Sequence, residues 1–239
     1  MDFKKALCVA AVMAAASSAF AAPSAEDVIR TTFQQRNNVA VQSVKPTPVP
    51  GIYEIYLGRL DQPVYTDATA SFVLNAPLWN LKTNENLTEK SRQARQAELF
   101  KSLPYQNAVK QVFGKGERKL VVFSDPACTF CRTLEKSLER VGNVTVYTFL
   151  FPALPRGPVQ IQDIICAKDP AKAWSDWMGH GVEPAHQRAG CDNGKIDANT
   201  DIAARFNVHG VPHMIFPDGT VQSGALDDGM LDKMLAEHQ

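Results

Sequence analysis

The order of apolar and polar positions in the middle of the chain predicts a strand, a turn and a helix in immediate succession. Residues Val121–Phe123 are β-branched or aromatic, which is typical of a buried strand. The next three residues, Ser124–Pro126, favour a turn. Beyond them, Leu134, Leu138 and Val141 recur at intervals of four and three residues. This spacing places them on one face of a helix.

Two cysteines, Cys128 and Cys131, lie between this turn and this helix and are separated by two residues. The predicted helix begins at the first cysteine, where unpaired backbone N–H groups and the helix dipole favour an anion. In such a motif, a helix N-terminus lowers the pKa of a cysteine from about 8.5 to roughly 3.5–7.5. We therefore predict that Cys128 is a nucleophilic thiolate and that the protein exchanges thiols with disulfides.

The pattern before this motif predicts a small first domain over residues 22–84. A helix capped by Ser24 is expected at 24–36. Short strands are expected at 39–44, 52–57, 63–66 and 70–74, with a proline-rich connector at 45–51. A sheet of this size with one helix is marginal alone. Its free edges or its apolar face are therefore expected to pair with a second subunit.

Residues 85–103 are polar on most faces and are predicted to form a linker helix that bridges two domains. Asn86 and Glu89 resemble a capping pair at its start, and Pro104 ends it. A second domain is predicted over residues 104–239. Its expected strands are 108–113, 119–124, 144–149, 213–216 and 220–223, with mainly helical structure at 152–207 and a closing helix at 227–238. The strands at 119–124 and 144–149 should run parallel because a helix connects them.

Composition and charge exclude several classes of protein. The chain has 239 residues, of which 45% are hydrophobic, so it is long and apolar enough for a packed core and is not a disordered chain. Its formal net charge is zero, which argues against nucleic acid as the main partner. The fold class expected is an α+β N-terminal domain joined by a linker helix to an α/β domain with a helical insertion.

The first 21 residues have the pattern of a secretory signal peptide. A short basic start precedes an apolar run that is too short to span a bilayer, and Ala19-Phe20-Ala21 supplies a cleavage site. Removal of residues 1–21 leaves 23 basic and 24 acidic residues, a formal net charge of −1, and four cysteines. An even number of cysteines in an exported chain points to disulfides. No later segment is apolar for long enough to cross a membrane.

The order strand, C-x-x-C helix, strand, helical insert, Gly-Val-Pro and final hairpin resembles the thioredoxin fold. In that superfamily the peptide bond before the proline is cis and faces the active cysteines, so Val211-Pro212 is expected to be cis. With the export signal and the extra N-terminal domain, essentially the whole mature chain resembles the DsbC/DsbG family of bacterial periplasmic disulfide isomerases. The likeness is specific in the second domain and is limited to the architecture in residues 22–84.

This resemblance implies roles for individual residues. Cys128 would be the attacking thiol, Cys131 the resolving thiol and Val211-Pro212 the loop beside them. The pair Cys166 and Cys191 would form a structural disulfide. The N-terminal domain would form a homodimer around a cleft that holds misfolded or oxidised exported proteins. A DsbD-like membrane reductant would keep the catalytic pair reduced in the periplasm, with no cofactor and no metal.

Two departures from the family pattern leave alternatives open. The dipeptide between the cysteines is Thr129-Phe130 instead of Gly-Tyr or Pro-Tyr, and Val211 stands where the isomerases usually have Thr. Both positions tune the redox potential, and a tenfold change in the exchange equilibrium needs only about 30 mV. A DsbG-like chaperone or reductase and a DsbA-like oxidase therefore remain alternatives to an isomerase.

Alternative interpretations exist for the cysteines and for one histidine. A structural bridge or half of a zinc site is the alternative for Cys128 and Cys131, and a second redox pair is the alternative for Cys166 and Cys191. Thioredoxin carries a buried carboxylate where this chain has Val122, so the sequence names no base for Cys131. His213 either lies near the sulfurs or faces solvent or a neighbouring loop.

Overall fold

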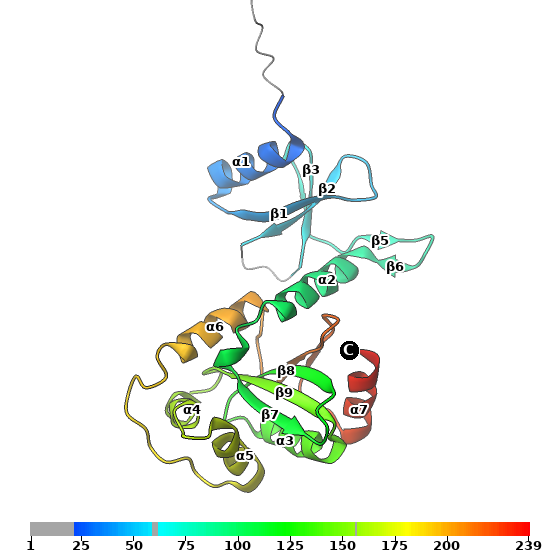
Figure 1. Ribbon diagram of the computed structural model, residues 1–239. Helices are drawn as coiled ribbons and strands as arrows, with labels where there is room; N and C mark the ends of the chain where they lie inside the picture. Colours follow the sequence, from blue (N-terminus) through cyan, green and yellow to red (C-terminus); the bar gives the residue numbers. More distant parts are fainter. Residues whose placement is uncertain (1–21, 59–61, 156) are drawn as a thin grey trace, which may run out of the picture.

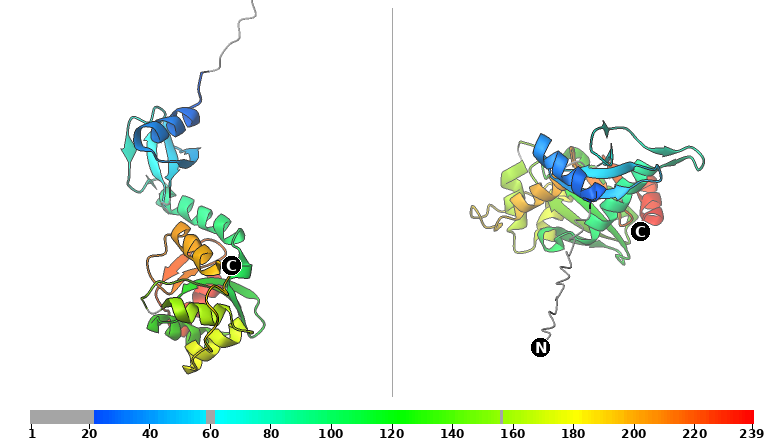
Figure 2. Two further views of the ribbon diagram at one scale, coloured as in Figure 1. Left: turned by 90° about the vertical axis from the view of Figure 1, so that its left-hand side faces the viewer. Right: turned by 90° about the horizontal axis from the view of Figure 1, so that it is seen from above.

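The protein is an elongated molecule in which two domains are stacked along the long axis and joined by one helix (Figures 1 and 2). The computed structural model describes residues 22–58, 62–155 and 157–239. The predicted signal peptide, residues 1–21, lies outside the described residues.

The first domain packs one helix against an antiparallel sheet. Helix α1 (Ala25–Asn37) begins at Ser24, whose hydroxyl accepts the N–H of Asp27 at 3.1 Å, and the Asp27 carboxylate accepts the N–H of Ser24 in return. The sequence predicts Ser24 as the cap, and the structure adds the reciprocal bond of a capping box. The sheet consists, in spatial order, of β1 (Val41–Pro46), β2 (Ile52–Leu57), β3 (Val64–Asp67) and β4 (Val73–Leu74). Its small core is made of Ile29, Phe33, Val41, Ile55 and Val64.

Two features of this domain differ from the sequence-based expectation. The strand expected at 70–74 is only β4, because the Asp67 carboxylate accepts the N–H groups of Ser71 and Phe72 and holds the preceding residues in a turn. A hairpin of β5 (Trp79–Asn80) and β6 (Glu85–Asn86) was not predicted. It projects from the body of the molecule beside the start of the next helix (Figure 1).

Helix α2 (Leu87–Lys101) is the linker, and its first half is bound to the N-terminal domain. The Thr88 and Tyr65 hydroxyls share a hydrogen bond of 2.5 Å, and Ser91 donates to the carboxylate of Glu54 at 2.6 Å. These contacts join α2 to β2 and β3. The linker is therefore packed against its first domain and is not a helix surrounded by solvent.

The second domain is a five-stranded mixed sheet with helices on both faces. In spatial order its strands are β11 (Val221–Ser223), β10 (His213–Ile215), β8 (Arg118–Ser124), β9 (Val144–Leu150) and β7 (Val109–Phe113). The β8–β9 pair is parallel and the other pairs are antiparallel, so the predicted parallel pair is confirmed. The 3₁₀ turn η1 (Tyr105–Asn107) leads into β7.

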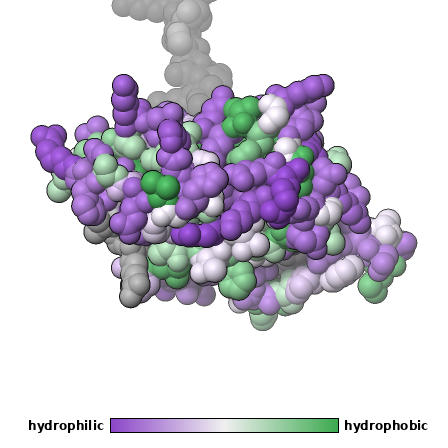
Figure 3. All heavy atoms as spheres, turned by 90° about the horizontal axis from the view of Figure 1, so that it is seen from below, coloured by the Kyte–Doolittle hydropathy of each residue, from purple (hydrophilic) through white to green (hydrophobic). Residues whose placement is uncertain are grey.

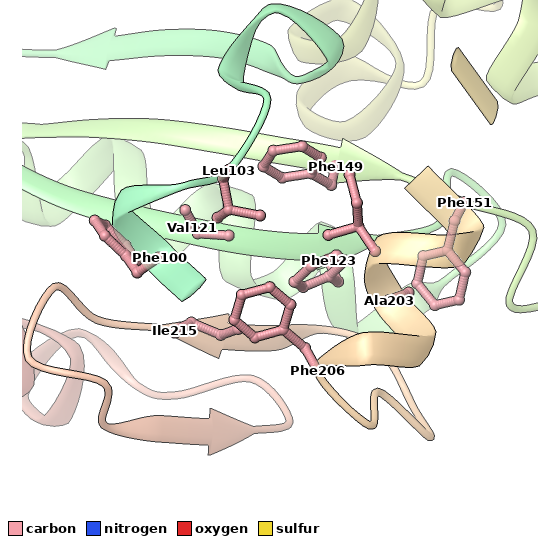
Figure 4. Close-up of a cluster of buried hydrophobic side chains, with 10 residues drawn as sticks. Phe100, Leu103, Val121, Phe123, Phe149, Phe151, Ala203, Phe206 and Ile215 are labelled. Carbon is pink, nitrogen blue, oxygen red and sulfur yellow. The ribbon is translucent and has the colours of Figure 1, made fainter. Parts of the chain in front are cut away.

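Alternate residues of the central strand β8 face two different cores. Leu120 and Val122 pack beneath α3 (Thr129–Val141) and α7 (Asp228–Glu237). Val121 and Phe123 point to the other face (Figure 4). The core on that face contains Phe100 and Leu103 from the end of the linker segment and Phe149, Phe151, Ile202, Ala203, Phe206 and Ile215 from the second domain. The linker thus supplies part of the second domain's core.

Within the residues that the structure describes, the helical insertion contains three helices and one long irregular stretch, in agreement with the mainly helical structure that the sequence predicts. It consists of α4 (Gly157–Ile165), α5 (Pro170–His180) and α6 (Lys195–Arg205). Residues 181–194 form no helix, because Gly181 ends α5 in the left-handed conformation with φ 71°. Cys166 at the end of α4 and Cys191 in this irregular stretch form a disulfide.

The surface of the second domain at the end far from the first domain is mostly hydrophilic, with hydrophobic side chains scattered among charged ones (Figure 3). Within the described ranges, no helix is both long and apolar enough to cross a bilayer.

The turn between β10 and β11 rests directly on the linker helix. A Cβ atom on Gly219 would lie 2.7 Å from the backbone nitrogen of Ala97 and still closer to the carbonyl oxygen of Gln93. The Gln93 side chain donates to the Asp218 carboxylate at 3.1 Å and to the Thr220 hydroxyl at 2.9 Å. Only glycine permits this approach, so α2 and the second domain are held together as one unit.

A comparison of Gly219→Ala with Gly224→Ala should separate the steric cost of this contact from the cost of a positive φ. Gly224 has nearly the same φ, 84° against 87°, but has no heavy atom within 4 Å of its virtual Cβ. Gly219→Ala should therefore lower the free energy of unfolding by about 1–3 kcal/mol more than Gly224→Ala, as overpacking does. Urea unfolding of the two variants measures the difference, and equal losses would contradict the contact.

Candidate active site

The turn that leads to the two cysteines is built around a buried aspartate. One carboxylate oxygen of Asp125 accepts the N–H of Ala127 at 2.8 Å, and the other accepts the N–H of Leu154 at 2.8 Å. The backbone carbonyl of Asp125 accepts the N–H of Cys128 at 3.0 Å. Asp125 therefore forms the turn, as the sequence suggests, and fixes where the first thiol emerges from the sheet.

Cys128 is the N-cap of α3, and its side chain takes the place that a serine or aspartate oxygen usually fills. Its sulfur accepts the backbone N–H of Cys131 at 3.1 Å. A sulfur at this position receives one of the N–H groups that the first helical turn leaves unpaired, and it lies at the positive end of the helix dipole. This arrangement stabilises a negative charge on the sulfur of Cys128.

The loop before β10 approaches Cys128 from the other side. The Val211–Pro212 peptide bond is cis. The Cys128 thiol donates to the carbonyl oxygen of Val211 at 3.5 Å, and Val211 packs against the cluster that contains both cysteines. Residues 83 positions apart in the sequence thus meet at one sulfur atom.

The two thiols are free and lie mostly beneath the surface. Cys128 is 5% exposed, whereas Thr129 is exposed and the Phe130 side chain is 68% exposed. The dipeptide between the cysteines therefore forms the outer surface of the site. A disulfide that reaches Cys128 must come into contact with Phe130.

Cys131 lies deeper, and its surroundings keep it protonated. Burial raises the pKa of the Cys131 thiol above its ordinary range, and the neighbouring Cys128 sulfur raises it further. The Ser124 hydroxyl and the backbone of Asp125 lower this pKa, but they do not outweigh the burial. Cys131 is thus a thiol at neutral pH while the sulfur of Cys128 is the one placed to carry charge.

Helix α5 of the helical insertion contacts the turn and the cluster that contain the two cysteines. The indole N–H of Trp177 on α5 donates to the carbonyl oxygen of Pro126 at 2.8 Å. The Arg132 guanidinium lies 5.0 Å from the centre of the Trp177 ring. Trp174, one helical turn earlier, is fully buried in the cluster that contains the cysteines. Trp174 is therefore part of the core, whereas Trp177 also binds the turn that leads to the cysteines.

Glu135, one helical turn after Cys131, is a buried carboxyl group that the sequence analysis missed. One of its oxygens accepts from the Gln111 amide and the other accepts from the Trp174 indole N–H at 3.1 Å. Burial raises the pKa of Glu135 to about 7, although both hydrogen bonds lower it. The signal was in the helical pattern, since residues 131, 135 and 138 share the face that the apolar residues define.

Glu135 should make stability depend on pH. Because its pKa is raised in the folded protein, the free energy of unfolding should fall as the pH rises from about 4.5 to about 7, by up to about 3 kcal/mol. Glu135→Gln should remove this fall, since the amide never ionises. The control is Glu237→Gln, which changes an exposed glutamate at the end of α7. Urea unfolding at pH 4.5 and 8 tests this, and an unchanged fall in Glu135→Gln would contradict it.

The sequence analysis also named His213, Cys166 and Cys191. His213 is buried, with its Nδ1 3.0 Å from the Ser223 hydroxyl and its ring against Phe123, so the solvent-facing interpretation is wrong. The Cys166–Cys191 disulfide has a Cα–Cα distance of 6.0 Å and joins α4 to the irregular stretch after α5. No cluster of three or more histidine, cysteine or acidic side chains that could hold a metal occurs among the described residues.

Both domains match known protein families. Residues 105–239 match the thioredoxin-like domain family, and residues 16–89 match the N-terminal domain family of disulfide bond isomerase proteins. Helix α2 lies mostly between the two matched regions.

Curated relatives cover most of the chain. It is 37% identical over 211 residues to the probable thiol:disulfide interchange protein DsbC of Bordetella pertussis, an alignment that covers 87% of this chain and 74% of that protein. It is 24% identical over 236 residues to the thiol:disulfide interchange protein DsbC of Escherichia coli, which covers 94% of this chain and 93% of that protein. A crystal structure of a disulfide interchange protein from Neisseria gonorrhoeae aligns with a TM-score of 0.52 and 34% identity, over 57% of this chain and 99% of that one.

Proposed function

Because this chain belongs to the DsbC family of thiol:disulfide interchange proteins, we propose that Cys128 and Cys131 are the residues with which it rearranges incorrect disulfide bonds in other proteins. The protein is a thiol–disulfide oxidoreductase. The observation that carries the assignment to this pair is the reduced Cys128 sulfur, capped by the N–H of Cys131 and adjacent to the cis Val211–Pro212 bond.

The chemistry proceeds through a covalent complex. The Cys128 thiolate attacks one sulfur of a client disulfide, a new S–S bond forms between them, and the other client sulfur leaves as a thiolate. A different client thiolate then attacks the mixed disulfide and leaves the client with a new pairing. If none does, Cys131 attacks the Cys128 sulfur and releases the reduced client, and the enzyme is left with a Cys128–Cys131 disulfide. The raised pKa of Cys131 delays this release, which gives the client time to rearrange.

Variants of the two cysteines test these roles separately. Cys131→Ala should leave the first attack intact and accumulate mixed disulfides with client proteins, visible on non-reducing gels. Cys128→Ser should lose essentially all isomerase activity, measured by recovery of a scrambled ribonuclease. Isomerase activity at the wild-type level in Cys128→Ser would rule out the proposed mechanism.

A thiol oxidase like DsbA is a second candidate, favoured by one feature of the loop. Val211 stands beside the Cys128 sulfur where the isomerases usually have Thr and DsbA has Val. The reduction potential of the Cys128–Cys131 pair separates the two, since a strongly oxidising value favours the oxidase. The DsbG-like alternative is a chaperone, or a reductase of single oxidised cysteines. A chaperone does not need the thiols, so a variant that lacks both Cys128 and Cys131 would still suppress aggregation.

The site of action that we propose is the periplasm, with residues 1–21 removed as a signal peptide. The pattern of a basic start, a short apolar run and an Ala-Phe-Ala cleavage site supports export. Clients would then be exported proteins with wrong disulfides, and a membrane reductant of the DsbD kind would return the Cys128–Cys131 pair to the dithiol.

We also propose that the protein is a homodimer joined through the open edge of the first sheet. Strand β4 lies at the end of the strand order, and consecutive apolar side chains, Phe72, Val73 and Leu74, are exposed there. An exposed apolar edge strand pairs readily with another strand. A dimer of this kind would hold two catalytic domains in one assembly.

A charge on this edge should break the dimer. Val73→Lys should produce a monomer, because it places an ammonium group in the interface where a 52% exposed valine stands. The control is Val182→Lys, which changes a valine of similar exposure, 56%, on the second domain. Light scattering gives the mass of each variant, and a dimer that survives Val73→Lys would exclude this edge.

A further inference from the structure

Ser124 occupies the end of β8, on the face of the sheet that α3 covers. Alternation along the strand places it on the same side as Leu120 and Val122, which pack beneath α3. Its register partner on β9 is Leu150, which packs in the same cluster as both cysteines. The side chain of Ser124 therefore lies under the beginning of the helix that carries the thiols.

The hydroxyl group of Ser124 is buried without an ordinary hydrogen bond. The residue is 1% exposed, and none of the described residues offers Oγ a hydrogen bond of normal geometry. A buried hydroxyl without a partner is unfavourable, so such groups are uncommon in folded proteins. The backbone carbonyl of the same residue is satisfied by the N–H of Phe151 at 3.2 Å. Of these two groups of Ser124, only the side-chain hydroxyl lacks a hydrogen bond of normal geometry.

Cys131 and Leu150, the register partner of Ser124, belong to one buried cluster, which brings the Cys131 thiol to the Ser124 hydroxyl. The Ser124 hydroxyl lowers the pKa of Cys131, which identifies it as a donor to the charged form of that sulfur. A serine hydroxyl donates one hydrogen, and a thiolate accepts more strongly than a neutral thiol does. The hydroxyl therefore gains a good partner only when Cys131 is deprotonated.

We propose that Ser124 donates a hydrogen bond to the Cys131 thiolate and thereby speeds the release of the client from the mixed disulfide. This inference rests on the proposed function and adds a residue that the family motif does not name. This hydrogen bond should not affect the first attack, because that step involves only the sulfur of Cys128 and the sulfurs of the client.

The step balances without an added oxidant or base. The Cys131 thiol loses its proton, its sulfur forms a bond to the sulfur of Cys128, and the bond between Cys128 and the client sulfur breaks. The client sulfur leaves with the electron pair and takes up the proton. One disulfide is consumed and one is formed, and Ser124 stabilises the charge that passes through the Cys131 sulfur.

Ser124→Ala tests the proposal, with Ser137→Ala as its matched control. Ser137 is equally buried, at 1% exposed, and lies on α3, but its hydroxyl donates to the carbonyl oxygen of Leu226 at 3.2 Å. The reduced protein is mixed with a model client that has one disulfide, samples are quenched with acid, and the mixed disulfide is followed with time. The formation of the adduct and its decay give two separate rates.

In Ser124→Ala, the adduct should form at the wild-type rate and decay about three- to tenfold more slowly, the range expected for loss of one hydrogen bond. Ser137→Ala should alter neither rate, and Ser124→Thr, which keeps a hydroxyl, should restore the decay. A thermal unfolding curve for each variant separates misfolding from chemistry. A purely structural hydroxyl without a partner could be removed with little loss of stability and no change in decay.

Decay at the wild-type rate in Ser124→Ala, or equal slowing in Ser137→Ala, would overturn the role of Ser124 and leave the proposed function intact. The absence of any adduct, in the wild-type protein and in Cys131→Ala alike, would overturn the proposed function together with it.

Discussion

The sulfur of Cys128 is held at the start of α3 by the backbone N–H of Cys131, and the chemistry of the second domain depends on this contact. Helices α1, α2, α5 and α7 of the same chain are capped by oxygens of Ser, Asn or Asp side chains. Helix α3 uses a sulfur in the same place. A capping atom must tolerate negative charge, because it receives an unpaired N–H at the positive end of the helix dipole. In the proposed mechanism, the N-cap position that helices commonly fill with an oxygen thus stabilises the thiolate of Cys128.

The two sulfurs differ because the scaffold places them at different depths. Cys128 caps the helix at the edge of the site, beside the exposed Phe130, whereas Cys131 faces the sheet and the insertion. The insertion also binds the site through Trp177, which donates to the turn, and Trp174, which donates to Glu135. Burial favours the neutral form of Cys131. In the proposed mechanism, Cys128 therefore attacks first and Cys131 acts in the later release step.

The linker helix gives the molecule its elongated form. Its first half is hydrogen-bonded to the N-terminal sheet, and its later turns are packed against Gly219 and extend into the core beside Phe123. Neither domain is therefore free to rotate about α2 without breaking buried contacts. In a dimer joined at β4, each site would be held at a set distance from its partner. A cleft between the two catalytic domains would then have a defined width for a client.

The local pattern of residues was sufficient to predict most secondary-structure elements and the C-x-x-C motif. Periodicity, caps and turn residues predicted most helices and strands of both domains and the position of Cys128 at a helix start, because these depend on neighbours within a few residues. The hairpin of β5 and β6 and the shortening of β4 were missed, since side-chain contacts and backbone turns override weak local preference there.

The sequence alone determined the order of elements, the C-x-x-C motif and the resemblance to a family, because each is written in residue type and spacing. Only the tertiary structure decided which groups surround the thiols. Val211 and Trp177 are brought to the site by the packing of β10 and α5 against it, across as many as 83 positions of sequence. The burial that raises the pKa of Cys131 is a property of that packing. No pattern along the chain measures how deeply a side chain will lie.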